Sequence, residues 1–501
     1  MNKNSGLKGL AKDTFVYGLS SIIGRFLNWL LVPMYVRVLS SPGEYGIVTN
    51  LYGWTALLLA FLTFGMETTF FRFANRNDEK APLQVYVNSL IFVAILSAIF
   101  VAIGILFLQP ISNVLGYATH PEYVGMLIFI VALDAITSIP FARLRCEEKA
   151  WKFAGIKLSN IGLNIILNLF FLLLCPVIHK HAPQTIDWFY RPDYGVGYIL
   201  VSNVITSIAN VIMLYKEFTG FSYRISTKRM RRMLTYAFPI FAMSIAGILN
   251  QSVDKILFPF LFSDKQEATT QLGIYGACFK IAVVMVMFIQ AYRYAIEPFI
   301  FKKNRENNDR ESNAITTLYF TIFSLMIFLG VSFYLDDIFK HLVSPDYYEG
   351  LRVVPIVMLG EFLYGLYFNL SFWYKLNDQT YWGTWFTVIG CIITISIIIW
   401  GVPIYGYIAC AWATVVCNGV MLLLSFFIGK KRYPVPYPLR KIGSYILLAI
   451  ILFCLGEYIP FETALWRIIW RTALLGIYII IAVRKDFPLQ SLPIVGKYFR
   501  K

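Results

Sequence analysis

Long apolar runs separated by short polar segments repeat along the whole chain. Each run reaches about the 20 residues that an α-helix needs to cross a bilayer and exceeds the roughly 9 to 11 residues of a transmembrane strand. Lipid offers the backbone no hydrogen-bond partners, so helices are the structures that satisfy such runs. The pattern predicts fourteen spans, near residues 14–38, 47–71, 83–108, 121–141, 155–177, 195–215, 235–260, 273–300, 313–335, 351–374, 381–401, 405–428, 442–459 and 467–483.

The first run follows the lysine-containing segment MNKNSGLKGLAKD, as a secretory signal would. It nevertheless reaches full spanning length and is not followed by a small-x-small cleavage site. We therefore expect a retained first helix.

Lysines and arginines fall almost entirely on one side of the predicted spans. With the amino terminus in the cytoplasm, the inside loops hold 31 of them and the opposite loops hold 4. This bias follows the positive-inside rule. An odd number of spans would disrupt the alternation of basic and non-basic loops. It supports fourteen spans with both termini in the cytoplasm. The most basic stretch, FSYRISTKRMRRML, is then an inside loop rather than a patch for nucleic acid or anionic lipid.

A weak internal repeat divides the chain. Pro33 lies 226 residues before Pro259, and the pair Gly46-Ile47 lies 227 residues before Gly273-Ile274. Transporters are often built from such repeats, with the substrate site between the halves. We predict an all-α integral membrane protein with two six-helix lobes related by a pseudo-two-fold repeat, followed by an appended helix pair. The predicted parts are an N-terminal lobe over 1–215, a basic linker over 216–234, a C-terminal lobe over 235–428, the pair over 442–483 and a cytoplasmic tail over 484–501.

Composition and motifs narrow the class of protein. Apolar residues make up 58% of the chain and charged residues 14%, against about 25% charged in soluble domains, which excludes an ordinary soluble enzyme. The net charge of +16 is mostly topological. The cysteines form no CxxC motif, and His179 and His181 lie in a loop expected to be solvated. Without a phosphate-binding glycine loop or catalytic motif, we predict no enzyme, no cofactor, no metal and no ATP-driven pump unless a partner supplies the engine.

A few charged residues remain inside the predicted spans. A charge at the bilayer centre costs at least roughly 2.5 to 3.5 kcal/mol, so retained charges usually face a cavity or a partner. The candidates that we single out are Arg25, Glu67, Asp134, Asp254, Lys255, Lys280, Arg293, Glu297 and Glu361. Arg25, Lys280 and Glu361 lie deepest in their spans.

The spacing of these charges predicts their partners. Arg293 and Glu297 are one turn apart and are expected to pair. Asp254 and Lys255 are adjacent, and their directions differ by about 100°, so each is expected to need another partner. Arg25 and Lys280 come from opposite halves and could line one cationic cavity, where arginine suits phosphate oxygens. Alternatively, Arg25 forms a buried pair with Glu67 or Asp134.

Several stretches resemble the bacterial polysaccharide flippases of the O-antigen and capsule type. They are LVPMYVRVLSSPGEYGIVTNLYG, FGMETTFFRF, NQSVDKILFPF, LGIYGACFKIAVVM, AIEPFIFKK, YYEGLRVVPIVMLG and GVPIYGYIACAWAT, in the family's order and spacing. That family shares a superfamily with multidrug and toxic-compound extruders and with peptidoglycan-precursor flippases.

The resemblance implies a fourteen-helix fold that alternates between inward-open and outward-open states. It implies that a polyprenyl-diphosphate-linked oligosaccharide moves from the cytoplasmic to the outer leaflet of the bacterial inner membrane, for lipopolysaccharide, capsule or exopolysaccharide synthesis. The family's first-helix arginine falls on Arg25, and its helix-seven acid–base pair on Asp254 and Lys255. Implied partners are membrane lipids, H⁺ or Na⁺, a glycan polymerase and glycosyltransferases, but no nucleic acid.

We therefore expect Arg25, Lys255 and Lys280, with Arg293 as an outlying contributor, to bind the diphosphate. The candidates for ion coupling are Glu67, Asp134, Asp254 and Glu361. Two rival hypotheses stay open. One is a cation-coupled multidrug extruder of the same fold, which would favour an acidic cavity. The other is a non-transporting membrane scaffold for a glycan-assembly complex.

Overall fold

The computed structural model describes residues 22–74, 82–307, 310–461 and 463–486. Every regular element in these ranges is helical, and thirteen helices are long and apolar enough to cross a membrane. The prediction of an all-α integral membrane protein is confirmed. The first predicted span, 14–38, lies partly outside the described residues; its described part is a helix over 22–29 and α2 (Val32–Val38).

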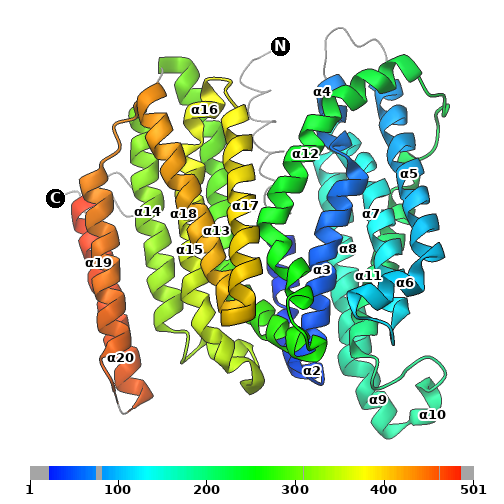
Figure 1. Cartoon of the computed structure of the whole chain (residues 1–501), viewed down its shortest axis with the longest axis horizontal. Coiled ribbons are helices and arrows are strands. Elements are labelled where there is room, and N and C mark those ends of the chain that lie inside the picture. The colour runs from blue at the N-terminus through cyan, green and yellow to red at the C-terminus, as the bar shows by residue number, and fades with distance from the viewer. Residues whose placement is uncertain (1–21, 75–81, 308–309, 462, 487–501) are drawn as a thin grey trace. The chain divides into compact units, whose positions relative to one another are not determined.

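The chain folds into two compact units, each a bundle of helices (Figure 1). Unit 1 comprises residues 1–276 and 394–407, and unit 2 comprises residues 277–393 and 408–501. The predicted lobe boundaries and the pseudo-two-fold relation stay predictions.

The main helices of unit 1 cover the predicted spans from the second to the seventh. They are α3 (Pro42–Thr63), α4 (Met66–Ala74), α5 (Pro82–Leu106), α6 (Leu108–Leu115), α7 (Pro121–Cys146), α8 (Ala150–Leu169), α9 (Cys175–His181), α10 (Pro183–Ile186), α11 (Gly195–Met213) and α12 (Thr227–Leu257). Short segments connect them: the π-helix η1 (Phe170–Leu174) and the 3₁₀ turns η2 (Tyr215–Glu217) and η3 (Phe258–Phe260). Helix α7 packs against α3, α5 and α11, and α12 packs against α3.

The break between α3 and α4 has a local cause. Phe64 and Gly65 have left-handed φ angles of 49° and 67°, a conformation that glycine adopts without steric cost. A Cβ on Gly65 would lie 3.2 Å from the carbonyl oxygen of Ala237. The break therefore lets α12 pass close to the backbone of the second span.

The two glycines of the internal repeat meet each other in unit 1. Gly46 lies near the start of α3, and Gly273 lies in the first turns of α13 (Lys265–Asn307). A Cβ on Gly46 would lie 1.8 Å from the carbonyl oxygen of Thr269, and a Cβ on Gly273 would lie 1.8 Å from that of Pro42. Each glycine thus contacts the residue four positions before the other, so the helix crossing is reciprocal. Only glycine fits such a close approach of two backbones.

Unit 2 holds the rest of α13 and the helices that follow it. They are α14 (Arg310–Phe333), the 3₁₀ segments η4 (Phe339–Leu342) and η5 (Pro345–Arg352), α15 (Val353–Leu370), α16 (Phe372–Leu376), part of α17 (Tyr381–Tyr405), α18 (Tyr407–Arg432), α19 (Leu439–Tyr458) and α20 (Ala464–Asp486). Helices α19 and α20 pack against each other, and both pack against α14 (Figure 1).

Candidate functional site

Asp254 and Lys255, near the end of α12, form an ion pair with each other. The Lys255 Nζ lies 3.2 Å from both carboxylate oxygens of Asp254, and the hydroxyl of Tyr275 donates to the same carboxylate at 2.8 Å. The expectation that these adjacent residues could not satisfy each other was wrong. The long lysine side chain curls back across the roughly 100° between the two positions, so the charge of Lys255 is already balanced.

A neutral hydrogen-bond network fixes this pair against α3. Asn50 donates its side-chain amide to the Lys255 carbonyl oxygen at 2.7 Å and accepts a hydrogen bond from Tyr117 at 2.7 Å. Asn50 is 1% exposed and Asp254 is 7% exposed. Buried polar groups with satisfied hydrogen bonds hold a specific geometry, so the network sets the position of the pair.

Asp134, in the middle of α7, has a different environment. It accepts a hydrogen bond from the hydroxyl of Ser207 on α11 at 2.8 Å. Lys157, on α8, acts on it electrostatically, while the Lys157 ammonium lies 4.1 Å from the centre of the Phe141 ring. Asp134 therefore has a neutral hydrogen-bond donor and a more distant cation instead of a contact ion pair.

A row of asparagines continues from Lys157 along the same face of α8. Asn160 donates to the carbonyl oxygen of Thr206 at 2.9 Å, and Asn164 donates to Asn203 at 2.9 Å. Asn168 accepts a hydrogen bond from Tyr35 at 3.0 Å. These amides make a polar strip between α8 and its neighbours in unit 1, at a depth where each polar group needs a partner.

Glu67 and Arg25 are not partners. Glu67 forms an ion pair with Arg145, at the end of α7, and the Arg145 guanidinium also lies 5.1 Å from the Phe71 ring centre. Arg25 is exposed on the first described helix. The alternative in which Arg25 is buried against Glu67 or Asp134 is not what the structure shows, because those carboxylates contact Arg145 and Ser207.

Two cations of unit 2 lie over the ring of Phe368, on α15. The Arg293 guanidinium and the Lys375 ammonium each lie 4.7 Å from the centre of this ring. Lys375 pairs with Glu297 at 2.9 Å, and Arg293 donates to the hydroxyl of Tyr364 at 3.5 Å. The expected pairing of Arg293 with Glu297 was therefore wrong: both residues are described, and they have different partners. Cation–π contacts stabilise both cations.

Lys280 and Glu361 are half-buried on α13 and α15, and both take part in interactions with other groups. Arg25 belongs to unit 1, whereas Lys280 and Arg293 belong to unit 2. A cavity shared by these cations stays a prediction.

Comparison with known proteins assigns the family. The family described as "Polysaccharide biosynthesis protein" matches residues 10–304, more than half of the 501 residues. The chain belongs to this polysaccharide biosynthesis protein family.

Two relatives of this family member come from Haemophilus influenzae. Lsg locus putative protein 1 is 23% identical over 293 residues, which is 58% of this chain and 66% of that protein, just under two thirds. An uncharacterized membrane protein is 20% identical over 409 residues, covering 75% of this chain and 89% of the relative.

Solved structures extend the likeness to nearly the whole chain. The lipid II flippase MurJ, in an inward closed conformation, is similar over 95% of this chain and 99% of its own, with a TM-score of 0.73 and 15% identity. An inward-facing multidrug resistance MATE family transporter is similar over 81% of this chain and 94% of its own, with a TM-score of 0.63 and 14% identity. At such identities these likenesses show the fold, which is that of a multi-pass membrane protein.

A basic cluster around the buried Arg471 in this family member was not among the residues predicted from the sequence. Arg471, on α20, is 3% exposed and donates to the carbonyl oxygens of Phe333 at 2.8 Å and Gly456 at 3.1 Å. It also pairs with Glu457 at 3.0 Å. Arg467, one turn earlier, pairs with Asp337, which follows α14. These contacts fasten α20 to α14 and α19.

A simple signal could have found this cluster. Arg467 and Arg471 lie four residues apart inside the predicted span 467–483, and Lys157 lies inside the span 155–177. All three lie within four positions of a predicted span boundary, where charges are easily assigned to a loop. Counting every cation within the spans would have included them.

Proposed function

We propose that this chain is a polysaccharide flippase of the bacterial inner membrane. It moves a polyprenyl-diphosphate-linked oligosaccharide from the cytoplasmic to the outer leaflet by alternating access. The observation that carries the proposal is the family match over residues 10–304 together with a MurJ-like fold over 95% of the chain. The proposed partners are the lipid-linked oligosaccharide, membrane lipids, H⁺ or Na⁺, a glycan polymerase and glycosyltransferases.

The proposed substrate site uses the cations in the helices. Arg25 and Lys280 carry the main role, because both lie deep in their predicted spans and come from opposite halves of the predicted repeat. Arg293 contributes from the aromatic surroundings of Phe368. Lys255 joins only when the substrate diphosphate displaces the Asp254 carboxylate that now balances its charge. A diphosphate offers several oxygens to guanidinium and ammonium donors.

Asp134 is our preferred candidate for ion coupling among Glu67, Asp134, Asp254 and Glu361. Glu67 and Asp254 each contact a cation directly, whereas the direct hydrogen bond to Asp134 comes from the neutral Ser207. A carboxylate without a contact cation can exchange a proton or a sodium ion without first breaking an ion pair.

Export in cells tests the proposed substrate site. Arg25→Ala and Lys280→Ala should each reduce surface glycan at least several-fold, and the double variant should abolish it, because each change removes a charge that attracts the diphosphate. Surface glycan is measured beside membrane-inserted protein by immunoblot. Lys180→Ala is the matched control, because it removes an exposed cation of the short helix α9 and should leave export unchanged.

The same experiment separates the rival functions. Wild-type export in both single variants and the double variant would contradict the cationic site and favour a non-transporting scaffold. The fold shared with MATE transporters keeps the multidrug extruder as a second candidate. Efflux of cationic dyes by cells that express the chain would support the extruder; we expect none.

A further inference from the structure

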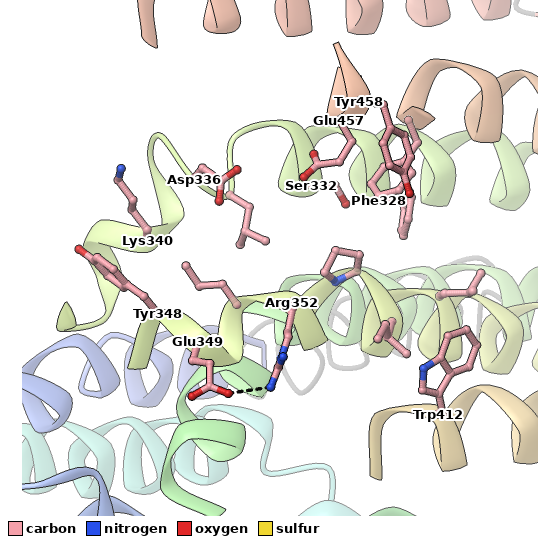
Figure 2. A pocket seen from close by; sticks show the side chains of 16 residues that line it. Phe328, Ser332, Asp336, Lys340, Tyr348, Glu349, Arg352, Trp412, Glu457 and Tyr458 are labelled. Atoms are coloured by element: carbon pink, nitrogen blue, oxygen red, sulfur yellow. Dashed lines mark hydrogen bonds and ion pairs between the residues drawn. The ribbon is translucent and has the colours of Figure 1, made fainter. Parts of the chain in front are cut away.

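Unit 2 contains a pocket of about 720 Å³ that the proposed transport function does not use. It lies between the end of α14, η5 with the start of α15, the start of α18 and the end of α19. Figure 2 shows Asp336, Ser332 and Glu457 on one wall and Tyr348, Arg352 and Trp412 on the facing wall. Arg352 pairs with Glu349 at 2.7 Å.

The lining changes from charged to apolar with depth. Along α14 and the turn after it, Phe328 precedes Ser332, which precedes Asp336; along α19, Phe453 precedes Glu457. The chain of η5 and α15 runs the opposite way and shows the reverse order, with charged residues before the apolar Ile356 and Leu359. The charged residues therefore lie at the ends of the predicted spans, on the predicted outer side, and the apolar ones lie inside them. A lipid has this same division between headgroup and acyl chains.

At the charged end of the pocket, Arg471 contacts two carboxylates that remain partly exposed. The buried Arg471 pairs with Glu457 at 3.0 Å and lies 3.6 Å from Asp336. The two acidic side chains nevertheless remain 48% exposed for Asp336 and 43% exposed for Glu457. Two arginines, Arg467 and Arg471, contact the three carboxylates Asp336, Asp337 and Glu457. One negative charge of this cluster therefore remains, and a further cation with several hydrogen-bond donors would complete the group.

Two further residues fit the same ligand. The Ser332 hydroxyl is buried in the pocket wall and has no hydrogen-bond partner among the described residues, so it lacks an interaction that a ligand could supply. Lys340 lies at the rim and places one positive charge beside the acidic pair. The pocket thus combines a site for an ammonium group, a nearby cation for a phosphate and an apolar floor.

We propose that this pocket binds a phospholipid with an ethanolamine headgroup from the outer leaflet. The primary ammonium donates hydrogen bonds to Asp336, Glu457 and Ser332, the phosphate lies near Lys340, and an acyl chain follows Phe328, Phe453 and Leu359. An anionic headgroup without an amine would meet the two carboxylates unfavourably. A trimethylated headgroup has no N–H to donate. This inference does not depend on the transported substrate.

Native mass spectrometry of the full detergent-solubilised chain tests the proposal. The protein is delipidated and titrated with phosphatidylethanolamine, phosphatidylcholine or phosphatidylglycerol of matched acyl chains. We expect at least fivefold more bound phosphatidylethanolamine than either other lipid at equal concentration. Asp336→Asn with Glu457→Gln should reduce this preference to less than twofold, whereas Asp346→Asn, an exposed acid of η5 outside the pocket, should leave it unchanged.

A second variant covers the case in which the double change disturbs Arg471 and folding. Leu359→Trp fills the apolar floor without altering a charge, and it should remove the preferred phosphatidylethanolamine adduct while the protein stays monodisperse. Equal binding of the three lipids by the wild type would overturn the proposal. So would a phosphatidylethanolamine preference that survives Leu359→Trp.

Discussion

At the scale of single residues, the partners of the charges inside the spans depend on side-chain reach and on neighbouring helices. Lys255 curls back to Asp254, and Glu297 takes Lys375 from another helix instead of Arg293 one turn away. Helical spacing predicts which residues share a face of one helix. The ion-pair partner of a charge is set by tertiary packing, which a spacing rule does not describe.

The ion pair of Asp337 with Arg467 predicts a pH dependence of the protein's stability. The hydrogen bond from Arg467 holds the pKa of this carboxyl below its usual range, although burial opposes the shift. A carboxyl with a depressed folded-state pKa stabilises the fold above its unfolded pKa and loses that contribution as the pH falls through the folded-state pKa. The pair should therefore contribute fully at pH 7 and progressively less below about pH 4.

The substitution Asp337→Asn tests this contribution. It should destabilise the detergent-solubilised protein at pH 7 by about 1 to 3 kcal/mol, because the charge of Arg467 loses its partner while that side chain stays partly exposed. Thermal unfolding at several pH values should show a constant difference from the wild type between about pH 8 and pH 5 that narrows at lower pH. The exposed Asp346→Asn serves as the control. A difference that widens on acidification would contradict the assigned sign.

At the scale of the helices, apolar runs located the spans well and their ends less well. The predicted span 235–260 corresponds to α12, which begins at Thr227 inside the basic segment. Lysine, arginine and methionine are good helix formers, so the helix continues beyond the apolar run that marks it. The break at Phe64 and Gly65 and the π-helix η1 within the fifth span depend on packing and carry little hydropathy signal.

The reciprocal contact of Gly46 and Gly273 predicts that a larger side chain at either position destabilises the helix crossing. Gly46→Ala or Gly273→Ala places a methyl group 1.8 Å from a backbone carbonyl oxygen, so the helices must separate. Overpacking of this kind costs typically about 1 to 3 kcal/mol and more where backbone has to move. We expect each variant to lower the unfolding temperature by several degrees and reduce the yield of monodisperse protein in size-exclusion chromatography.

Gly162→Ala on α8 is the matched control, because a Cβ there meets nothing within 4 Å. Alanine is favoured over glycine inside helices by roughly 0.5 to 1 kcal/mol, so this variant should be as stable as the wild type or more stable. A loss of stability at Gly162 equal to that at Gly46 would show that the crossing is not the cause.

At the scale of the whole molecule, composition and hydropathy predicted a multi-pass helical membrane protein, and the fold confirms it. The candidate site was only partly predictable. The positions of Arg25, Lys280 and the other charges can be read from the chain. The ion pair that balances Lys255 and the burial of Arg471 beside the pocket of unit 2 cannot be read from it. Contacts such as that of Arg471 with Phe333 join residues more than a hundred positions apart, so local sequence patterns do not contain them.

The most direct test of the central claim is flipping by the purified protein in liposomes. A fluorescent polyprenyl-diphosphate-linked oligosaccharide is incorporated, and its movement between leaflets is followed by quenching from outside. We predict that the wild-type chain moves this lipid at least tenfold faster than protein-free liposomes, and that Arg25→Ala with Lys280→Ala removes most of the acceleration while Lys180→Ala retains it. A wild-type rate equal to that of protein-free liposomes would contradict the proposed function, and an unimpaired double variant would contradict the cationic site.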